Sequence, residues 1–250
     1  MIDIHCHLEF IERKKEVLRE AKEKMKAIIT SCADPKNAEE ILNLKKDYKN
    51  FLFLSLGFHP EYLKNYKENQ IKNYLNFIKK KRKEIVAIGE VGLDYSQSCE
   101  DIDRERMKEV FLKFIDLAKE LNLPLVIHAR DAFNDVLEIL ENKGAKKVCL
   151  HCFSGSEGNL KEALNLNYFI SFATNLCYTK KHPRLARKTP LERIFLETDS
   201  PWLNPDNPKK LENRPWKIAK SAKVLASLKN ISVEKVLEIT TNNAKEFFKI

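Results

Sequence analysis

The sequence predicts a (β/α)8 barrel, and three observations lead to this expectation. Eight short apolar runs alternate with helix-length amphipathic segments from one end of the chain to the other. The length of 250 residues is typical of eight strand–helix units. An open doubly wound sheet shares the alternation, but the Gly-rich phosphate-binding turn that such folds often carry is missing. No repeat, linker or low-complexity tract divides the chain, so we expect a single domain over residues 1–250.

The expected strands are short runs rich in Ile, Val, Leu and Phe. Parallel strands that are buried on both faces have this composition. In chain order, the runs span residues 2–7, 26–32, 51–58, 85–90, 124–128, 148–153, 168–173 and 194–199. Helix-length polar segments separate the runs, as the alternation of a barrel requires.

The expected helices show apolar residues every three or four positions and signals at their ends. Over 104–121 this spacing is kept by Met107, Val110, Phe111, Phe114, Ile115 and Ala118. A helix over 132–143 is expected to be capped by Asp131 and followed by Gly144. The final helix is expected over 232–248, where a Ser-Val-Glu start precedes the apolar pattern.

The composition excludes several classes of protein. Gly and Pro number only 6 and 9, which argues against a disordered or collagen-like chain. No signal-like segment and no uninterrupted run of about 18 apolar residues occurs, so we expect neither a signal peptide nor a membrane span. The six cysteines form no pair of CxxC motifs, and we expect reduced thiols in a cytoplasmic protein.

Histidines and carboxylates gather at the ends of the expected strands. The first strand ends in His5 and His7, which point the same way because they lie two residues apart. Later strand ends carry His59, Glu90, His128, His151 and Asp199. A single residue of this kind is commonly a core histidine or a helix cap. However, five of the six histidines lie at such ends, and in a barrel all these ends meet at one rim.

This set of side chains predicts a metal site. Imidazole and carboxylate groups together suit Zn²⁺, Mn²⁺ or a similar divalent cation. Besides His59, the set holds six candidate ligands: His5, His7, Glu90, His128, His151 and Asp199. Six are more than one ion usually needs, which indicates a two-metal centre. We therefore expect two divalent metal ions, Mg, Mn or Zn, as cofactors.

Seven motifs occur in an order that matches one known family. They are HCH, GFHP, AIGEVGLDY, HARDAF, LHCFSGS, LETDSPWL and NRP, and they extend along the whole chain. In these motifs the sequence resembles TatD-type metal-dependent hydrolases of the amidohydrolase superfamily. The resemblance implies hydrolysis of phosphodiester bonds in DNA, commonly as a 3′→5′ exonuclease that prefers single strands.

The resemblance also implies a role for each strand-end residue. One metal would be held by His5, His7, Glu90 and Asp199, and the other by Glu90, His128 and His151, so that Glu90 bridges the two. His59 matches a family histidine near the scissile phosphate, and Glu197 and Arg130 match positions beside the metals. Asp199 is also the expected acceptor of the proton from the attacking water.

Glu197 and Arg130 each have a competing structural interpretation. Glu197 lies two residues before Asp199 in the same strand, where it can orient a metal ligand or pair with a buried Lys or Arg. Arg130 follows His128 at the rim, where its guanidinium can bind phosphate with two hydrogen bonds or pair with Asp131.

The net charge of +9 divides into two groups of cations. The run Lys79–Lys83 precedes the fourth strand and is expected to be a solvated helix end, away from the metals. A second group follows strands four, seven and eight, and suits a phosphodiester backbone: Arg104, Arg106, Lys180, Lys181, Arg184, Arg187, Lys188, Lys209, Lys210 and Arg214. Trp202, Phe58 and Tyr95 lie near the same face, either packed in the barrel or available to stack on an unpaired base.

The sequence departs from the family pattern at two positions. The late motif, often Asn-Glu-Pro, is Asn213-Arg214-Pro215 here, and a position that is often Gln is Met107. Arg214 adds positive charge near the expected substrate path and is a candidate substrate contact. Neither change touches an expected metal ligand, so both bear on the substrate rather than on the hydrolytic chemistry.

Two rival functions stay open from the sequence, as does the oligomeric state. The superfamily's site is chemically permissive, so an ester, amide or lactone such as an aminoacyl-tRNA ester is an alternative substrate. A nucleic-acid or metal-binding protein without turnover is the other rival. The complete set of six ligands argues against it, because a binding module has no need of an open two-metal site.

Overall fold

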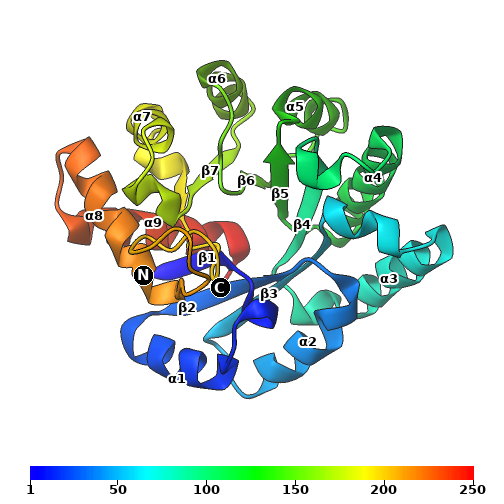
Figure 1. Ribbon diagram of the computed structural model, residues 1–250, viewed down its shortest axis with the longest axis horizontal. Coiled ribbons are helices and arrows are strands. Elements are labelled where there is room, and N and C mark those ends of the chain that lie inside the picture. Colours follow the sequence, from blue (N-terminus) through cyan, green and yellow to red (C-terminus); the bar gives the residue numbers. More distant parts are fainter.

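The computed structural model describes residues 1–250 and confirms the (β/α)8 barrel. Eight parallel strands form one sheet in the order β1 to β8. The sheet curves into a nearly closed barrel with helices around the outside (Figure 1). The strands are β1 (Ile2–Cys6), β2 (Ala27–Cys32), β3 (Leu52–Phe58), β4 (Ala87–Asp94), β5 (Leu125–Arg130), β6 (Val148–Leu150), β7 (Phe169–Phe172) and β8 (Ile194–Leu196).

Nine α-helices surround or close the barrel. They are α1 (Lys14–Lys24), α2 (Ala38–Lys46), α3 (Glu68–Lys80), α4 (Arg104–Leu121), α5 (Phe133–Asn142), α6 (Glu157–Asn165), α7 (Lys181–Lys188), α8 (Ile218–Lys229) and α9 (Val233–Phe248). The expected helix over 104–121 is α4, and α9 starts where the sequence predicts because the Ser232 side chain accepts a hydrogen bond from the Lys235 amide. None of these helices combines the length and the apolarity needed to cross a membrane.

The predicted cap of α5 is wrong. Ala132 occupies the N-cap position and no side chain caps this helix. Asp131 instead has a φ of 54°, a left-handed conformation that turns the chain between β5 and α5. Gly144 follows α5 with a φ of 61°, as the sequence predicts for a helix end.

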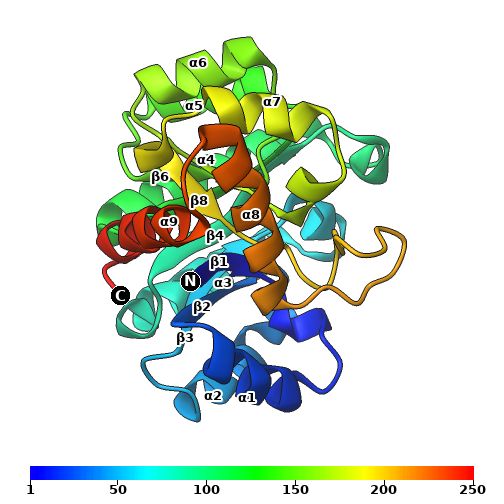
Figure 2. The same ribbon diagram turned by 90° about the vertical axis from the view of Figure 1, so that its left-hand side faces the viewer.

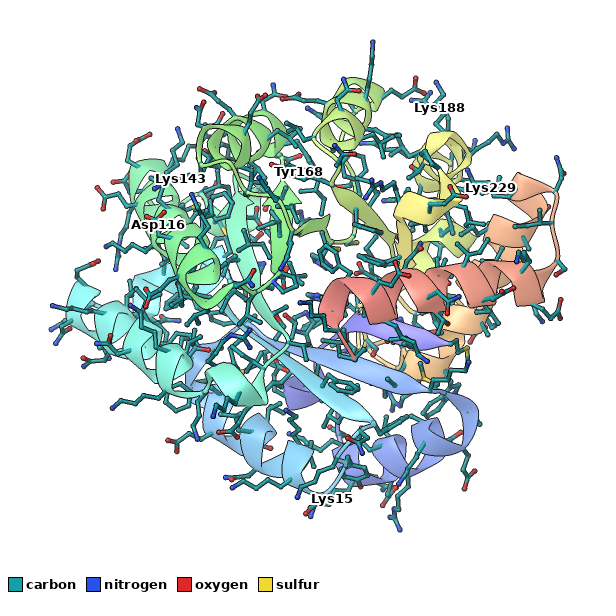
Figure 3. All side chains as sticks on the ribbon, turned by 180° about the vertical axis from the view of Figure 1, so that it is seen from behind. Lys15, Asp116, Lys143, Tyr168, Lys188 and Lys229 are labelled. Atoms are coloured by element: carbon teal, nitrogen blue, oxygen red, sulfur yellow. The ribbon has the colours of Figure 1, made fainter.

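The lower half of the barrel interior is an apolar layer, which we call the floor. Its buried members are Ile2, Ile4, Ala27, Ile29, Ala87, Val126, Cys149 and Phe195, together with Ala244 and Phe248 of α9. In Figure 2, α9 lies at one end of the barrel and the loop after β8 at the other. The view from behind shows α9 crossing this closed end (Figure 3). The floor therefore fills the barrel at the amino ends of the strands.

Hydrogen bonds join β1 to the segment that follows β8, although the two are far apart in the sequence. The Asp199 amide donates to the His5 carbonyl at 3.0 Å, and the His7 amide donates to the Ser200 carbonyl at 2.8 Å. Below them, the buried carboxylate of Asp3 accepts the amide of Thr198 at 3.0 Å and its hydroxyl at 2.5 Å. This closure places the first and last predicted metal ligands side by side.

The outer surface carries exposed ion pairs between neighbouring helices. Lys143 donates to both carboxylate oxygens of Asp116 at 2.9 and 3.0 Å, and both residues are labelled in Figure 3. Lys79, in the basic run at the end of α3, pairs with Glu120 at 2.6 Å. Such exposed pairs contribute roughly 0–1 kcal/mol each. In the run Lys79–Lys83, the residues Lys79, Lys80 and Lys83 are exposed at the end of α3 as predicted, whereas Lys81 and Arg82 are half-buried.

Candidate metal centre

A pocket of about 420 Å³ opens at the carboxyl ends of the strands, and we call it the central pocket. Its lining includes most of the predicted site residues: His7, His59, Glu90, His128, Arg130, His151 and Asp199. His5 lies beneath it, fully buried, with its Nε2 3.0 Å from the Nε2 of His7. Residues that are far apart in the sequence therefore meet where the barrel fold predicts.

Glycine residues allow the backbone around Glu90 to pack closely. A Cβ at Gly57 of β3 would lie 2.3 Å from the Glu90 carbonyl oxygen, so no other residue fits there without movement. Gly92 has a φ of 154°, and a Cβ there would lie 1.9 Å from the His128 carbonyl oxygen. Both pairings of β4 also shift register beside Glu90. These features turn the Glu90 side chain into the barrel.

The two carboxylate oxygens of Glu90 face two different pairs of histidines. Oε1 lies 2.7 Å from Nδ1 of His128 and 3.0 Å from Nε2 of His151. Oε2 lies 3.4 Å from Nε2 of His5 and 3.5 Å from Nε2 of His7. Burial raises the pKa of Glu90, but His151, His59 and His128 outweigh it, and the pKa falls well below the usual range.

Asp199 completes the group around His5 and His7. Its Oδ1 lies 3.4 Å from Nε2 of His7 and 3.8 Å from Nε2 of His5. Its side chain is 18% exposed, so the carboxylate also meets solvent in the pocket. Burial would raise its pKa, but the hydrogen bond with His7 and the charge of His151 lower the pKa to about 2.

Glu197 orients His151, which is the first of its two predicted roles. Its Oε1 lies 3.0 Å from Nδ1 of His151 and accepts the amide of Cys152 at 2.7 Å, while Oε2 accepts the hydroxyl of Ser171 at 2.6 Å. No Lys or Arg lies within ion-pair distance of this buried carboxylate. With Nδ1 engaged by Glu197, the Nε2 atom of His151 is left to face Glu90.

Two further carboxylates orient histidines, and the sequence reasoning missed both. Glu9 lies 3.4 Å from Nδ1 of His7, and Asp94 lies 3.0 Å from Nε2 of His128. The signal for Asp94 was its position at the end of the strand that carries Glu90, four residues further on. Glu9 follows His7 by two residues in a 3-10 turn, where strand alternation no longer predicts direction.

His59 presents one nitrogen to the pocket. Its Nδ1 accepts the Glu61 amide at 3.2 Å, so the neutral ring carries its proton on Nε2, which lies 3.8 Å from Glu90. Burial and the neighbouring His128 lower the pKa of His59 to about 3. His59 is therefore a neutral hydrogen-bond donor that faces the centre of the pocket.

The other predicted substrate contacts lie in different places. Arg130 is exposed at the pocket wall and forms no ion pair, so the predicted pairing with Asp131 is absent. Arg214 lies outside the lining of the central pocket, and its guanidinium donates to the Asn213 carbonyl at 2.8 Å. Trp202 lines the pocket beside His7, with ring centroids 5.2 Å apart.

Phe58 has the first of its two predicted roles, packing in the core rather than stacking on a base. Only 2% of its surface is exposed, and it packs against Tyr66, Tyr74 and Phe114 between the sheet and the helices. The alternation of β3 explains this position, because Phe58 is next to His59 and therefore turns away from the pocket. Among the three aromatic residues, Trp202 and Tyr95 line cavities at this end of the barrel.

The donor set fits divalent metal ions. Ligand atoms of His5, His7 and Glu90 lie within 4.8 Å of one another, as do those of Glu90, His128 and His151, and those of His5, His151 and Asp199. The Nδ1 of His5 is buried without a hydrogen-bond partner, while its Nε2 faces two carboxylates and another imidazole. Convergent imidazole nitrogens and carboxylate oxygens of this kind are the ligands of such ions in hydrolases.

Comparison with known proteins gives the same result over the full chain. The family model described as TatD related DNase matches residues 2–249. The chain belongs to the TatD family. Deoxyribonuclease TATDN3 of Homo sapiens is 35% identical to this chain, and the match covers 99% of this chain and 94% of the human protein. An uncharacterized metal-dependent hydrolase of Bacillus subtilis, YabD, is also 35% identical, over 100% and 99% of the two chains.

A solved TatD structure has the same fold. The crystal structure of the TatD homolog YJJV from Escherichia coli superposes with a TM-score of 0.91, covering 100% of this chain and 98% of that one at 24% identity. The family model and the two relatives confirm the expected family, and this TatD-family chain is a metal-dependent hydrolase. The strand-end histidines and carboxylates form its candidate metal centre.

Proposed function

We propose that this TatD-family protein hydrolyses phosphodiester bonds of DNA with two divalent metal ions. One ion would be held by His5, His7, Glu90 and Asp199, and the other by Glu90, His128 and His151. The observation that supports this division is the Glu90 carboxylate, whose two oxygens face separate pairs of histidines. Mg²⁺, Mn²⁺ and Zn²⁺ all suit these ligands.

The bound ions would stabilise negative charge on the phosphoryl oxygens. They would also lower the pKa of a bound water, so that hydroxide is available at neutral pH. Asp199 is the proton acceptor for the attacking water, because its carboxylate lies at the pocket wall and is partly open to solvent. His59 donates from Nε2 to a phosphate oxygen, since its Nδ1 is an acceptor. Arg130 is free to bind phosphate, and Glu197 holds His151 in position.

DNA is the proposed substrate, attacked as a 3′→5′ exonuclease on single strands. The human relative is named a deoxyribonuclease, and the family model carries the same activity in its description. Trp202 and Tyr62 line the central pocket beside the histidines, where an unpaired base can stack.

All six cysteines are free thiols, which supports the proposed location in the cytoplasm.

A 3′-labelled single-stranded oligodeoxynucleotide tests this function. With Mg²⁺ or Mn²⁺ present, the full chain should release labelled nucleotides, and a chelator should stop the release. Glu90→Gln should abolish release, while Asp116→Asn, a change in an exposed carboxylate on α4, should not. Turnover of an aminoacyl or lactone ester without DNA cleavage would favour the ester alternative. DNA binding without any turnover would contradict both enzymatic functions.

A further inference from the structure

A second cavity of about 500 Å³ opens beside the central pocket, and we call it the rim pocket. Its wall includes Tyr95 after β4, Asp131 after β5 and Lys181 at the start of α7. Asp94 and Arg130 line the central pocket, and the residues that follow them line the rim pocket. The ends of β4 and β5 therefore lie between the two cavities, which are neighbours at the same end of the barrel.

Cations without carboxylate partners line the rim pocket. Arg104 and Lys181 form no ion pair, and the Lys181 ammonium donates only to the Ser154 carbonyl, at 2.5 Å. The carboxylate of Asp135 is already neutralised by Lys108 at 3.0 Å. Asp131 is the remaining unpaired acid, and Arg130 adds a free cation between the two pockets. The available charge thus favours an anionic ligand.

Arg104 and Tyr95 form a fixed platform in this wall. The Arg104 guanidinium lies 4.3 Å from the centroid of the Tyr95 ring. The ring is held because its hydroxyl donates to Asp135 at 2.8 Å and its amide donates to the Arg130 carbonyl at 2.9 Å. Arg104 is exposed, so the face of its guanidinium opposite Tyr95 is free to stack on a planar ligand.

We propose that the rim pocket is a second nucleotide subsite. It would bind the retained part of a single strand whose scissile phosphate lies in the central pocket. Unpaired bases stack on arginine planes and aromatic rings without regard to sequence, which suits the Arg104–Tyr95 platform. Lys181 and Arg130 lie where they can neutralise the backbone phosphates. This subsite rests on the proposed DNA hydrolysis and adds a path for the strand beyond the metals.

Arg104→Ala and Lys181→Ala test the subsite, separately and combined, in the metal-loaded full chain. Two substrates are compared: a single-stranded oligodeoxynucleotide long enough to reach the rim pocket, and bis(p-nitrophenyl) phosphate, which cannot reach it. Loss of one stacked base should raise KM for the oligonucleotide about tenfold. The kcat on the oligonucleotide, and the hydrolysis of bis(p-nitrophenyl) phosphate, should change less than about twofold.

Arg193→Ala is the matched control. Its guanidinium also lies over an aromatic ring, 5.1 Å from the centroid of Phe169. Arg193 immediately precedes β8 and Phe169 begins β7, so this pair lies at the closed end of the barrel. Removing the same charge there should leave KM for the oligonucleotide unchanged.

The outcomes separate the subsite from the proposed function. If the unmodified protein cleaves DNA but both rim variants keep its KM, the subsite is wrong and the function stands. If the unmodified protein hydrolyses bis(p-nitrophenyl) phosphate but no DNA, both are wrong. An equal loss on the two substrates would also contradict the subsite, because it would show a general structural effect.

Discussion

The floor of the barrel and the polar layer above it are built by the same strands, yet they have opposite chemistry. In β5 the floor residue Val126 is followed two positions later by His128, and Cys149 of β6 is followed two positions later by His151, just past the end of the strand. Residues two positions apart in a strand point to the same face. The same face of the strand therefore carries an apolar residue in the floor and a histidine above it. We call the upper set, His5, His7, Glu90, His128, His151, Glu197 and Asp199, the ligand layer.

The comparison shows that two different sets of interior side chains stabilise the fold and carry the chemistry. The floor buries apolar side chains against α9, and burial of apolar surface is the main stabilising contribution to folding. The ligand layer instead gathers carboxylates and imidazoles that need partners when buried. Mutations in the two layers should therefore have different consequences.

The largest expected effect comes from Glu90→Gln in the ligand layer. The change removes the charge that faces five histidines. Both proposed metal ions should therefore be lost together, and kcat should fall by about a thousandfold or more. The circular dichroism spectrum should stay that of the folded protein. Full activity with a normal metal content would contradict the bridging role of Glu90.

Phe195→Ala makes the corresponding change in the floor. Phe195 is fully buried and stacks on Phe169 with centroids 4.5 Å apart. We expect the free energy of unfolding, measured with urea, to fall by about 3–5 kcal/mol. Leu211, of which 62% is exposed, is the surface control, and its replacement by Ala should change the free energy by less than about 0.5 kcal/mol. The folded fraction of Phe195→Ala should keep its activity, and a specific loss of kcat would contradict the separation of layers.

Metal removal should show how far the ligand layer depends on its ions. Ions that bind only the folded chain stabilise it by about 2.7 kcal/mol at a concentration one hundred times the Kd. Chelation should therefore lower the melting temperature of the unmodified protein, as measured by calorimetry. Glu90→Gln should show little response to the chelator. An unmodified protein that melts at the same temperature with and without metal would mean that no ion is held there.

Glu197→Gln should give the smallest of these effects. The amide still fits beside His151, Cys152 and Ser171 but loses the carboxylate charge that fixes the imidazole. Loss of such an orienting group typically costs about 10–100-fold in metal affinity or activity. Metal titration followed by activity assays checks this range. An unchanged affinity and kcat would show that Glu197 has only a packing role.

The barrel and the gathering of the ligands could be predicted because both follow from strand geometry. Parallel strands buried on both faces appear as continuous apolar runs, and their carboxyl ends meet at one rim. The prediction that was wrong, the Asp131 cap of α5, lies next to a strand end. The sequence does not show that Asp131 has a left-handed backbone.

The orienting carboxylates were missed for a related reason. Glu9 lies in a 3-10 turn after β1. Asp94 lies in β4, which continues four residues beyond its expected end. Register shifts between β3, β4 and β5 decide which side chains of β4 face inward. These shifts depend on packing between strands, which the pattern of a single strand does not contain.

Anomalous diffraction from crystals loaded with Mn²⁺ tests the central claim most directly. We expect two anomalous peaks on either side of the Glu90 carboxylate, one next to His5 and His7 and the other next to His128 and His151. A single peak, or two peaks that do not share Glu90, would contradict the bridged two-metal centre.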